Sequence, residues 1–279
     1  MIFIGLLIGI VGYALLYLGK GIQKYAIEGL KAKKVARGKN YRTWIFGTFL
    51  TSIYFAIEWV ALLFAPIHLI APLGGVGLLV MLPFAYYILH EEIYKIQIVG
   101  IGLIIIGIFI VTFFNPNVRT LTRENFNISL FLIFSLSIII IKMTAIIISR
   151  FKHYFGGGLI IGITAGTFNA LQTVSKRITA IPDLFITIIF TVVTFLMAIL
   201  TLIFTQFAFT KAKANIVMSC DISAHISFAV LIGFIALHER IEIMQFIGMG
   251  VIIIGIILVT AYRKRIKRAK YRKKVKNPV

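Results

Sequence analysis

The feature that most constrains the fold of this chain is a series of nine apolar stretches, each about 20 residues long. A helix rises 1.5 Å per residue, so a stretch of about 20 residues crosses roughly 30 Å of hydrocarbon. With 60% hydrophobic and 14% charged residues, a chain of 279 residues could not bury this surface in an aqueous fold. We therefore predict an all-α integral membrane protein with about nine transmembrane helices. The expected spans are 1–19, 43–65, 67–89, 96–114, 128–149, 159–176, 184–208, 215–237 and 242–262.

An internal repeat adds a second constraint. Residues 90–114 reappear as residues 238–262, identical at 13 of 25 positions without a gap. The first four spans then correspond to the last four. Because a single span lies between them, the second unit crosses the membrane in the opposite direction. We expect two inverted four-helix repeats joined by a central helix. The repeated polar and glycine positions are His90/His238, Glu91/Glu239, Gln97/Gln245, Gly100/Gly248, Gly102/Gly250 and Gly107/Gly255.

The repeat also divides the chain into expected domains. These are a first repeat at 1–114, a linker with the fifth span at 115–158, a second repeat at 159–262, and a basic tail at 263–279.

Basic residues are unevenly distributed between the two sides of the predicted membrane. The net charge is +20, with eight Lys and Arg residues between the first two spans and ten in the tail. If the first loop is cytoplasmic, 23 basic residues lie inside and 5 outside. The positive-inside rule then predicts a multi-pass protein of the cell membrane, with its N-terminus outside and its C-terminus in the cytoplasm. The tail is expected to bind anionic lipid headgroups, and nucleic acid is not expected as a partner.

Few polar side chains interrupt the apolar spans. An ionisable residue at bilayer depth costs upwards of ~2.5 kcal/mol, so such residues are candidates for a binding site. Asp221 and His225, four residues apart, would share one helical face. Asn169 and Gln172, three residues apart in the sixth span, would also share a face. The candidate substrate-binding residues are Glu58, Asn169, Gln172, Asp221 and His225.

Each candidate also has a structural interpretation. Asn169 and Gln172 could join helices through hydrogen bonds, and Asp221 could form a local pair with His225. Lys142, deep in the fifth span, could neutralise Glu58 or Asp221, or extend its ammonium towards the interface.

A further group of residues is assigned a structural or gating role. Glu91 and Glu239 begin the fourth and ninth spans, where a carboxylate complements the helix dipole. The first repeat contains Pro72 and Pro83 where the second has Cys220 and Leu231, so the halves are not equivalent. The residues in this group are Glu91, Glu239, Lys142, Pro72 and Pro83.

Motifs for catalysis are missing from the sequence. HEEIY and HERIE lack the second histidine of a zinc-protease motif, and no phosphate-binding loop or nucleophile elbow occurs. One cysteine permits neither a disulfide nor a cysteine-based metal cluster. We expect no enzymatic activity and no cofactor.

Residues 64–114 resemble the core of the drug/metabolite transporter superfamily. They contain a proline-bearing span that ends near a glutamate, then a glutamine and a glycine-rich span. The nine-span arrangement is similar to the NIPA-like magnesium transporter branch, with LGKGIQKYAIEGL at 18–30, Trp44 and Phe64-Ala65-Pro66. This resemblance implies a secondary transporter that works by alternating access on Mg²⁺ or another divalent cation. Glu58 and Asp221 would then be the carboxylate ligands of the metal, because Mg²⁺ prefers oxygen.

Two alternatives stay open. The ten-span EamA-like transporters share the proline and glutamate motifs, which allows an exporter of a small organic metabolite or amino acid. In that case the aromatic residues Tyr13, Tyr17, Trp59 and Phe168 would shape an apolar pocket. A non-transporting membrane scaffold or lipid-binding protein is the other alternative, and the oligomeric state, including a homodimer, is left open.

Overall fold

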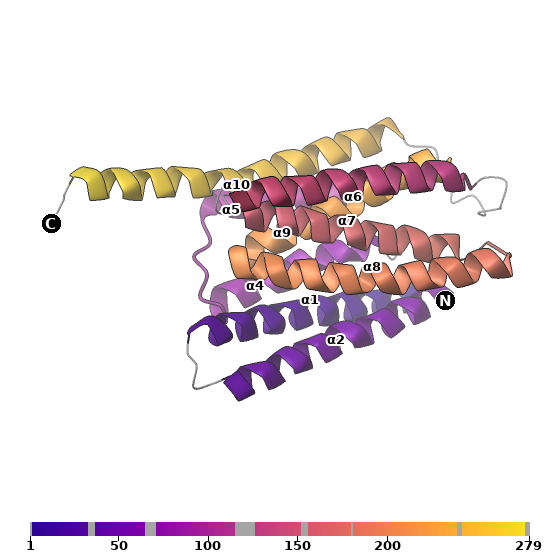
Figure 1. The fold of residues 1–279 in the computed structure, drawn as a ribbon, viewed down its shortest axis with the longest axis horizontal. Coiled ribbons are helices and arrows are strands. Elements are labelled where there is room, and N and C mark those ends of the chain that lie inside the picture. The colour runs from indigo at the N-terminus through magenta and orange to yellow at the C-terminus, as the bar shows by residue number, and fades with distance from the viewer. Residues whose placement is uncertain are drawn as a thin grey trace.

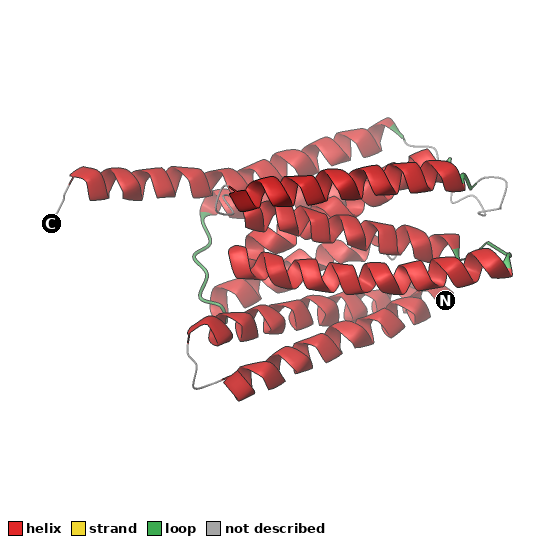
Figure 2. Ribbon diagram, viewed as in Figure 1, coloured by secondary structure: helices red, strands yellow, loops and turns green. Residues whose placement is uncertain are grey.

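The computed structural model describes residues 2–32, 37–64, 71–114, 126–151, 156–179, 181–238 and 242–276. Within these ranges the chain forms helices joined by short connections, with no strand (Figure 2). The predicted all-α class is confirmed. The elements are α1 (Ile2–Ala32), α2 (Arg37–Phe64), the 3₁₀-helix η2 (Ala71–Gly75), α4 (Val76–Tyr87), α5 (Lys95–Phe113), α6 (Ile128–Phe151), α7 (Gly157–Ile178), α8 (Leu184–Lys211), α9 (Ala214–Ala236) and α10 (Ile243–Lys276).

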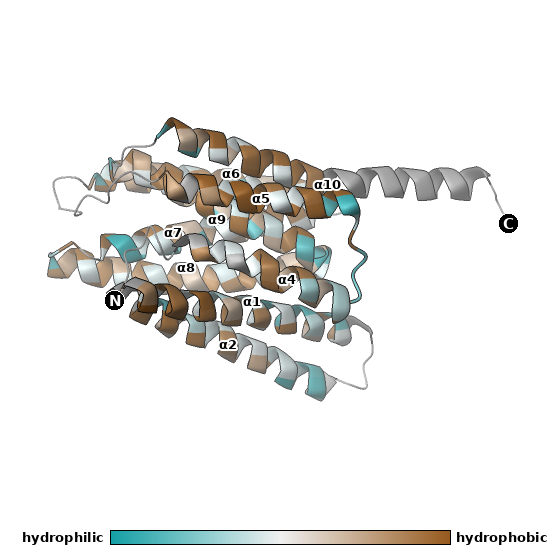
Figure 3. Ribbon diagram, turned by 180° about the vertical axis from the view of Figure 1, so that it is seen from behind, coloured by the Kyte–Doolittle hydropathy of each residue, from teal (hydrophilic) through white to brown (hydrophobic). Residues whose placement is uncertain are grey.

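Helix length and surface hydropathy indicate a membrane protein. Within the part of the chain that the structure describes, four helices are long and apolar enough to cross a bilayer, namely α1 over Phe3–Leu30, α6, α8 and α9. Shorter apolar helices cover Leu73–Tyr87, Lys95–Ile110 and Ile243–Val259. Apolar residues make up much of the helices, with polar residues near helix ends and connections (Figure 3), and many large apolar side chains are exposed. Such an apolar exterior suits lipid, because a helix satisfies its own backbone hydrogen bonds there.

The first helix is longer than its predicted span. The sequence suggested a loop from residue 20, but α1 continues to Ala32 and buries both Lys20 and Lys24. The Lys24 ammonium donates hydrogen bonds to the carbonyl oxygens of Phe209, at 2.9 Å, and Ala212, at 3.0 Å. These carbonyls lie at the C-terminal end of α8, where a cation complements the helix dipole. Two of the basic residues assigned to the cytoplasmic loop are therefore part of the bundle.

The predicted third span is divided into two pieces. Residues 71–75 form the 3₁₀-helix η2, and α4 follows with twelve residues and Pro83 inside it. Proline and the two glycines of the APLGG segment are poor α-helix formers, which accounts for the tighter turn.

After α4 and α9 the chain leaves the helix through His90 and His238, both with φ of 50°. Histidine is one of the residues enriched in this left-handed region, so the repeated histidine has a backbone role.

The two repeated glycine-rich helices, α5 and α10, pack directly against each other. A Cβ added to Gly107 would lie 2.7 Å from the carbonyl oxygen of Gly248, and one added to Gly100 would lie 2.8 Å from that of Gly255. Each glycine thus meets the repeat counterpart of the other. Gln97 lies beside this contact and donates from Nε2 to the carbonyl oxygen of Val259 at 3.2 Å. The close approach requires glycine on both helices.

The other helices pack mainly against one another. α1 lies along α2, and α7 packs on both α8 and α9. The C-terminal end of α1, the N-terminal end of α2 and the C-terminal part of α10 lie at the same end of the bundle (Figure 1). This is the arrangement expected if the basic segments share one side of a membrane.

Candidate functional site

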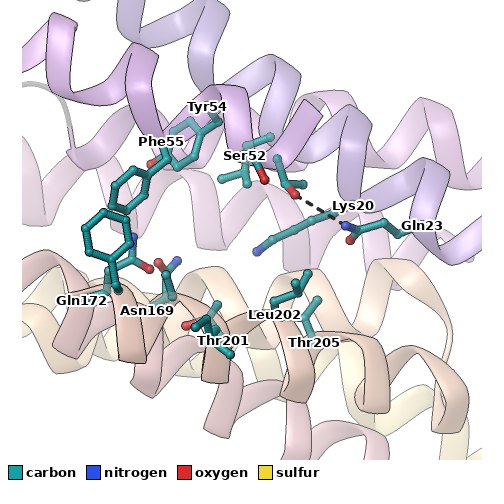
Figure 4. A pocket seen from close by; sticks show the side chains of 15 residues that line it. Lys20, Gln23, Ser52, Tyr54, Phe55, Asn169, Gln172, Thr201, Leu202 and Thr205 are labelled. Atoms are coloured by element: carbon teal, nitrogen blue, oxygen red, sulfur yellow. Dashed lines mark hydrogen bonds between the residues drawn. The ribbon is translucent and has the colours of Figure 1, made fainter. Parts of the chain in front are cut away.

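A cavity of about 350 Å³ lies between α1, α2, α7 and α8 (Figure 4). Its wall combines aromatic rings, hydroxyl and amide groups, and one ammonium group. The polar and aromatic side chains that line it are Lys20, Gln23, Thr51, Ser52, Tyr54, Phe55, Asn169, Gln172, Phe195, Thr201 and Thr205.

Four polar side chains on the cavity wall have no hydrogen-bond partner in the described part of the chain. Asn169 and Gln172 come from α7, where the sequence allowed either a substrate site or hydrogen bonds between helices. The structure places both amides at the cavity, without such bonds among the described residues (Figure 4). The buried hydroxyls of Thr201 and Thr205, on α8, are also unpaired there. A buried polar group without a partner loses free energy unless water or a ligand satisfies it, so this wall is suited to binding.

Asp221 forms an ion pair with a lysine of the first helix. The Lys20 ammonium lies 2.6 Å from Asp221 Oδ2, and the two side chains are 7% and 0% exposed. The other carboxylate oxygen, Oδ1, has no hydrogen-bond partner within the described residues. Lys20 also lines the cavity, so the pair connects the cavity with the buried carboxylate.

Glu58 has an equivalent arrangement with a lysine of the second half. Its Oε2 is paired with the Lys176 ammonium, and its Oε1 accepts a 3.2 Å hydrogen bond from the Tyr13 hydroxyl. The suggestion that Lys142 neutralises Glu58 or Asp221 is therefore wrong. The Lys142 ammonium instead lies 5.0 Å from the ring centre of Phe228.

His225 lies close to both ion pairs but is not bonded to Asp221. Its Nε2 is 2.9 Å from the Thr173 hydroxyl of α7, so the alternative of a local Asp221–His225 pair is not observed among the described residues. The charges of Asp221 and Glu58 both act on the His225 ring. Of the five predicted residues, Glu58 on α2 and Asp221 and His225 on α9 are thus buried outside the described cavity lining, whereas Asn169 and Gln172 line the cavity.

Lys20 and Lys176 are the residues that sequence reasoning missed. Both lie where a polar segment joins an apolar span, so the sequence pattern assigns them to a loop or to the membrane interface. One signal could have found Lys20. Lys20, Gln23 and Lys24 follow the spacing of a single helical face, and the sequence through Ala32 consists largely of good helix formers.

The residues assigned a structural or gating role have varied positions. The Glu91 carboxylate accepts hydrogen bonds from the backbone N–H groups of Ala214, at 2.6 Å, and Asn215, at 3.4 Å. It therefore complements the dipole at the start of α9, rather than that of α5 as the sequence suggested. Burial is the main reason why the pKa of Glu91 is raised above its ordinary value. Glu239 lies outside the described residues, and Pro72 lies in the turn of η2.

The donor set does not resemble a preformed cage for a transition metal. Among the described residues, no three or more His, Cys, Asp or Glu side chains converge on a common point that could hold an ion. The carboxylates of Glu58 and Asp221 are each paired with a lysine ammonium, and the described cavity wall adds neutral amides and hydroxyls. Such a site could interact with a cation that keeps much of its water, as Mg²⁺ does.

A helical bundle with an apolar exterior, buried ion pairs and a polar cavity has the features of a membrane transporter, since ionisable groups at bilayer depth are generally functional. The comparison with known families agrees. The magnesium transporter NIPA family matches residues 2–210, and the chain belongs to this family. The resemblance predicted from the sequence is thereby confirmed.

Individual relatives are more distant. The probable magnesium transporter NIPA2 of Arabidopsis thaliana is 29% identical to this chain over 98 residues. That alignment covers 35% of this chain and 29% of the relative, so the chain matches less than a third of that protein. No solved structure matches the chain.

Proposed function

We propose that this protein is a secondary transporter that moves Mg²⁺ or another divalent cation across the cell membrane by alternating access. Family membership supports a membrane transporter, and the name of the Arabidopsis thaliana relative supports magnesium. The observation that carries the proposal is the buried Asp221 carboxylate, which has one oxygen unpaired among the described residues and is joined through Lys20 to a cavity with polar groups on its wall.

The chemistry of the cavity fits a partly hydrated cation. Mg²⁺ gives up its water reluctantly and is commonly held by one or two carboxylates together with several waters. Asn169 and Gln172 offer amide oxygens, and Thr201 and Thr205 offer hydroxyl oxygens, as acceptors for such waters. Asp221 would supply the negative charge.

Alternating access is supported by contacts that recur in the two halves. The α5–α10 contact is reciprocal, as two units related by a two-fold axis would make it. Gln97 Oε1 accepts from the backbone N–H of Tyr94 at 3.2 Å, and Gln245 Oε1 accepts from that of Glu242 at 3.1 Å. These pairs are separated by the same offset as the sequence repeat. We propose nine spans in two inverted units, with the N-terminus outside and the C-terminus in the cytoplasm.

The decisive experiment measures Mg²⁺ flux into proteoliposomes. Asp221→Asn and Glu58→Gln each remove one buried negative charge with little change of shape. We expect each to lower the initial rate at least tenfold, equivalent to about 1.4 kcal/mol. Glu242→Gln is the matched control, because this side chain is exposed and should leave the rate unchanged. Full flux in both membrane variants would remove the basis of the proposal.

A second candidate function is the transport of a small organic solute. It is favoured by the aromatic wall of Tyr54, Phe55 and Phe195, and because Lys20 alone is charged among the described lining residues. Of the aromatic residues expected to shape such a pocket, Tyr13, Tyr17 and Phe168 are absent from its described lining, and the side chain of Trp59 lies outside what the structure describes. Thermal stabilisation by organic solutes but not by Mg²⁺ would decide for this candidate.

A further inference from the structure

We infer that Lys20 and Lys176 are built-in competitors of the transported cation. Each ammonium occupies a buried carboxylate while substrate is absent, and the cation has to displace it in order to bind. This inference rests on the proposed transport of a divalent cation. It assigns a role to two lysines that the proposed function itself leaves unexplained.

The geometry at Asp221 is that of a site already filled by a cation. The 2.6 Å contact with Lys20 is short even for a charge-assisted hydrogen bond, and the carboxylate is completely buried. A metal ion at Asp221 could use Oδ1, which is unpaired among the described residues. The Lys20 charge would nevertheless repel an ion at that distance. The ammonium therefore has to leave Asp221 before the carboxylate can serve a second cation.

The same relationship holds at Glu58, with the halves exchanged. Lys20 lies in the first half and pairs with a carboxylate of the second, whereas Lys176 lies in the second half and pairs with a carboxylate of the first. The Lys20–Asp221 pair thus joins α1 to α9, and the Lys176–Glu58 pair joins α7 to α2. Opening them frees one half to move relative to the other, which couples cation binding to the movement that alternating access requires.

Each ammonium already faces a second partner, which stays within reach once the carboxylate is taken by the cation. Lys20 Nζ lies 5.2 Å from the ring centre of Tyr17, and Lys176 Nζ lies 4.2 Å from that of Phe55. An aromatic face attracts a cation at such distances. Lys20 also borders the cavity, where the hydroxyls of Thr201 and Thr205 are unpaired acceptors. A short movement of the side chain would exchange one set of partners for another.

Competition of this kind should also favour divalent over monovalent cations. The attraction of a carboxylate for an ion scales with the ion's charge, so a divalent ion can displace a tethered ammonium more readily than a monovalent ion can. The lysine also lowers the apparent affinity, by the fraction of time for which it leaves the carboxylate free. Removing the lysine should therefore tighten binding, and strengthening its ion pair should weaken binding.

Substitutions of opposite effect test the inference in the full-length protein, with KM for Mg²⁺ measured in proteoliposomes. Lys20→Met removes the competitor, and we expect KM to fall by about tenfold. Lys20→Arg retains the charge and can pair in bidentate fashion with Asp221, so KM should rise. Lys176→Met and Lys176→Arg should behave in the same way. Lys142→Met is the matched control, since among the described residues this membrane lysine contacts Phe228 and no carboxylate, and its KM should equal that of the wild type.

The outcomes separate the inference from the proposed function. If wild-type protein moves no Mg²⁺, the proposed function fails and takes the inference with it. If wild-type protein moves Mg²⁺ but both substitutions of each lysine raise KM or leave it unchanged, the function stands and the inference is wrong. If Lys20→Met fails to fold, KM for Mg²⁺ in Lys20→Arg, Lys176→Met and Lys176→Arg tests the inference by the same criteria. As a second measure, Mg²⁺ should raise the melting temperature of the Met variants more than that of the wild type, and an equal rise would contradict competition.

Discussion

The Glu91 carboxylate joins segments of the chain that are 123 residues apart. It accepts the backbone N–H groups of Ala214 and Asn215, which begin α9 and have no partner inside the helix. The carboxylate is also largely buried, and burial disfavours its charged form. These effects oppose each other, and burial prevails, so that the pKa of Glu91 is raised.

This balance predicts a pH dependence of stability. Because the folded protein holds a proton on Glu91 more tightly than the unfolded chain does, the associated stabilisation is complete below the unfolded pKa, about 4.3. It is lost as pH rises through the higher folded pKa. We expect Glu91→Gln to remove this decline from the melting temperature of the detergent-solubilised protein between pH 4 and pH 7. Glu242→Gln, at an exposed site, should keep the wild-type profile, and identical profiles for all three proteins would contradict the assignment.

Single residues of the site differ in how well the sequence could predict them. Asp221 and Glu58 are conspicuous as carboxylates in long apolar runs, and the structure places both in buried ion pairs. Their partners Lys20 and Lys176 lie at the margins of apolar runs, where a charge has an ordinary explanation as an interface residue. Only the packing of helices distant in sequence shows that these two lysines turn inward.

At the level of elements, the contact between α5 and α10 depends on glycine at specific positions. Gly107 faces the carbonyl oxygen of Gly248 and the Ile252 side chain, each 2.7 Å from where a Cβ would lie. Gly102, five residues earlier on the same helix, has nothing within 4 Å of such an atom. The two glycines therefore provide a matched pair for mutation.

Gly107→Ala should force the two helices apart, and we expect a loss of about 1–3 kcal/mol, the usual cost of overpacking. Gly102→Ala should be neutral or stabilise α5 by up to about 1 kcal/mol, because alanine is the better helix former. Melting temperatures of both variants in detergent provide the measurement. Equal stability of the two proteins would mean that the helices can separate without penalty.

The elements themselves could be predicted in type more reliably than in extent. Apolar length identifies α6, α8 and α9 directly, since each is long and apolar enough to span a bilayer. The C-terminal end of α1 and the division between η2 and α4 differ from the prediction for local reasons. Lysines and a glutamine continued α1 beyond its apolar part, and the APLGG segment interrupted the helix despite its apolar character.

At the scale of the whole molecule, two of the contacts that join the proposed repeats differ in character. The glycine contact between α5 and α10 is apolar and reciprocal, whereas the two ion pairs are buried and link α1 with α9 and α2 with α7. Breaking a buried ion pair is costly unless both charges find new partners. The glycine contact is therefore suited to act as a pivot, and the ion pairs are suited to separate only when a substrate cation replaces the lysines.

Removing the basic tail distinguishes a transporter from a scaffold that functions through this tail. Residues 263–279 carry ten Lys and Arg residues, and α10 extends beyond the bundle towards its C-terminal end (Figure 1). The described lining of the cavity comes from α1, α2, α7 and α8, and the two ion pairs join α1 with α9 and α2 with α7. We expect deletion of 263–279 to leave KM for Mg²⁺ unchanged in proteoliposomes of neutral lipid.

The same deletion should alter the response to lipid composition. Each basic residue near an anionic surface contributes roughly 1 kcal/mol of attraction, so the tail should make the full-length protein sensitive to anionic lipid. We expect its flux to change when anionic lipid is added, and the truncated protein to show no such change. The basic residues between α1 and α2 remain after truncation, so the orientation in the membrane should also be retained. Complete loss of Mg²⁺ flux on truncation would instead place the function in the tail and favour the lipid-binding alternative.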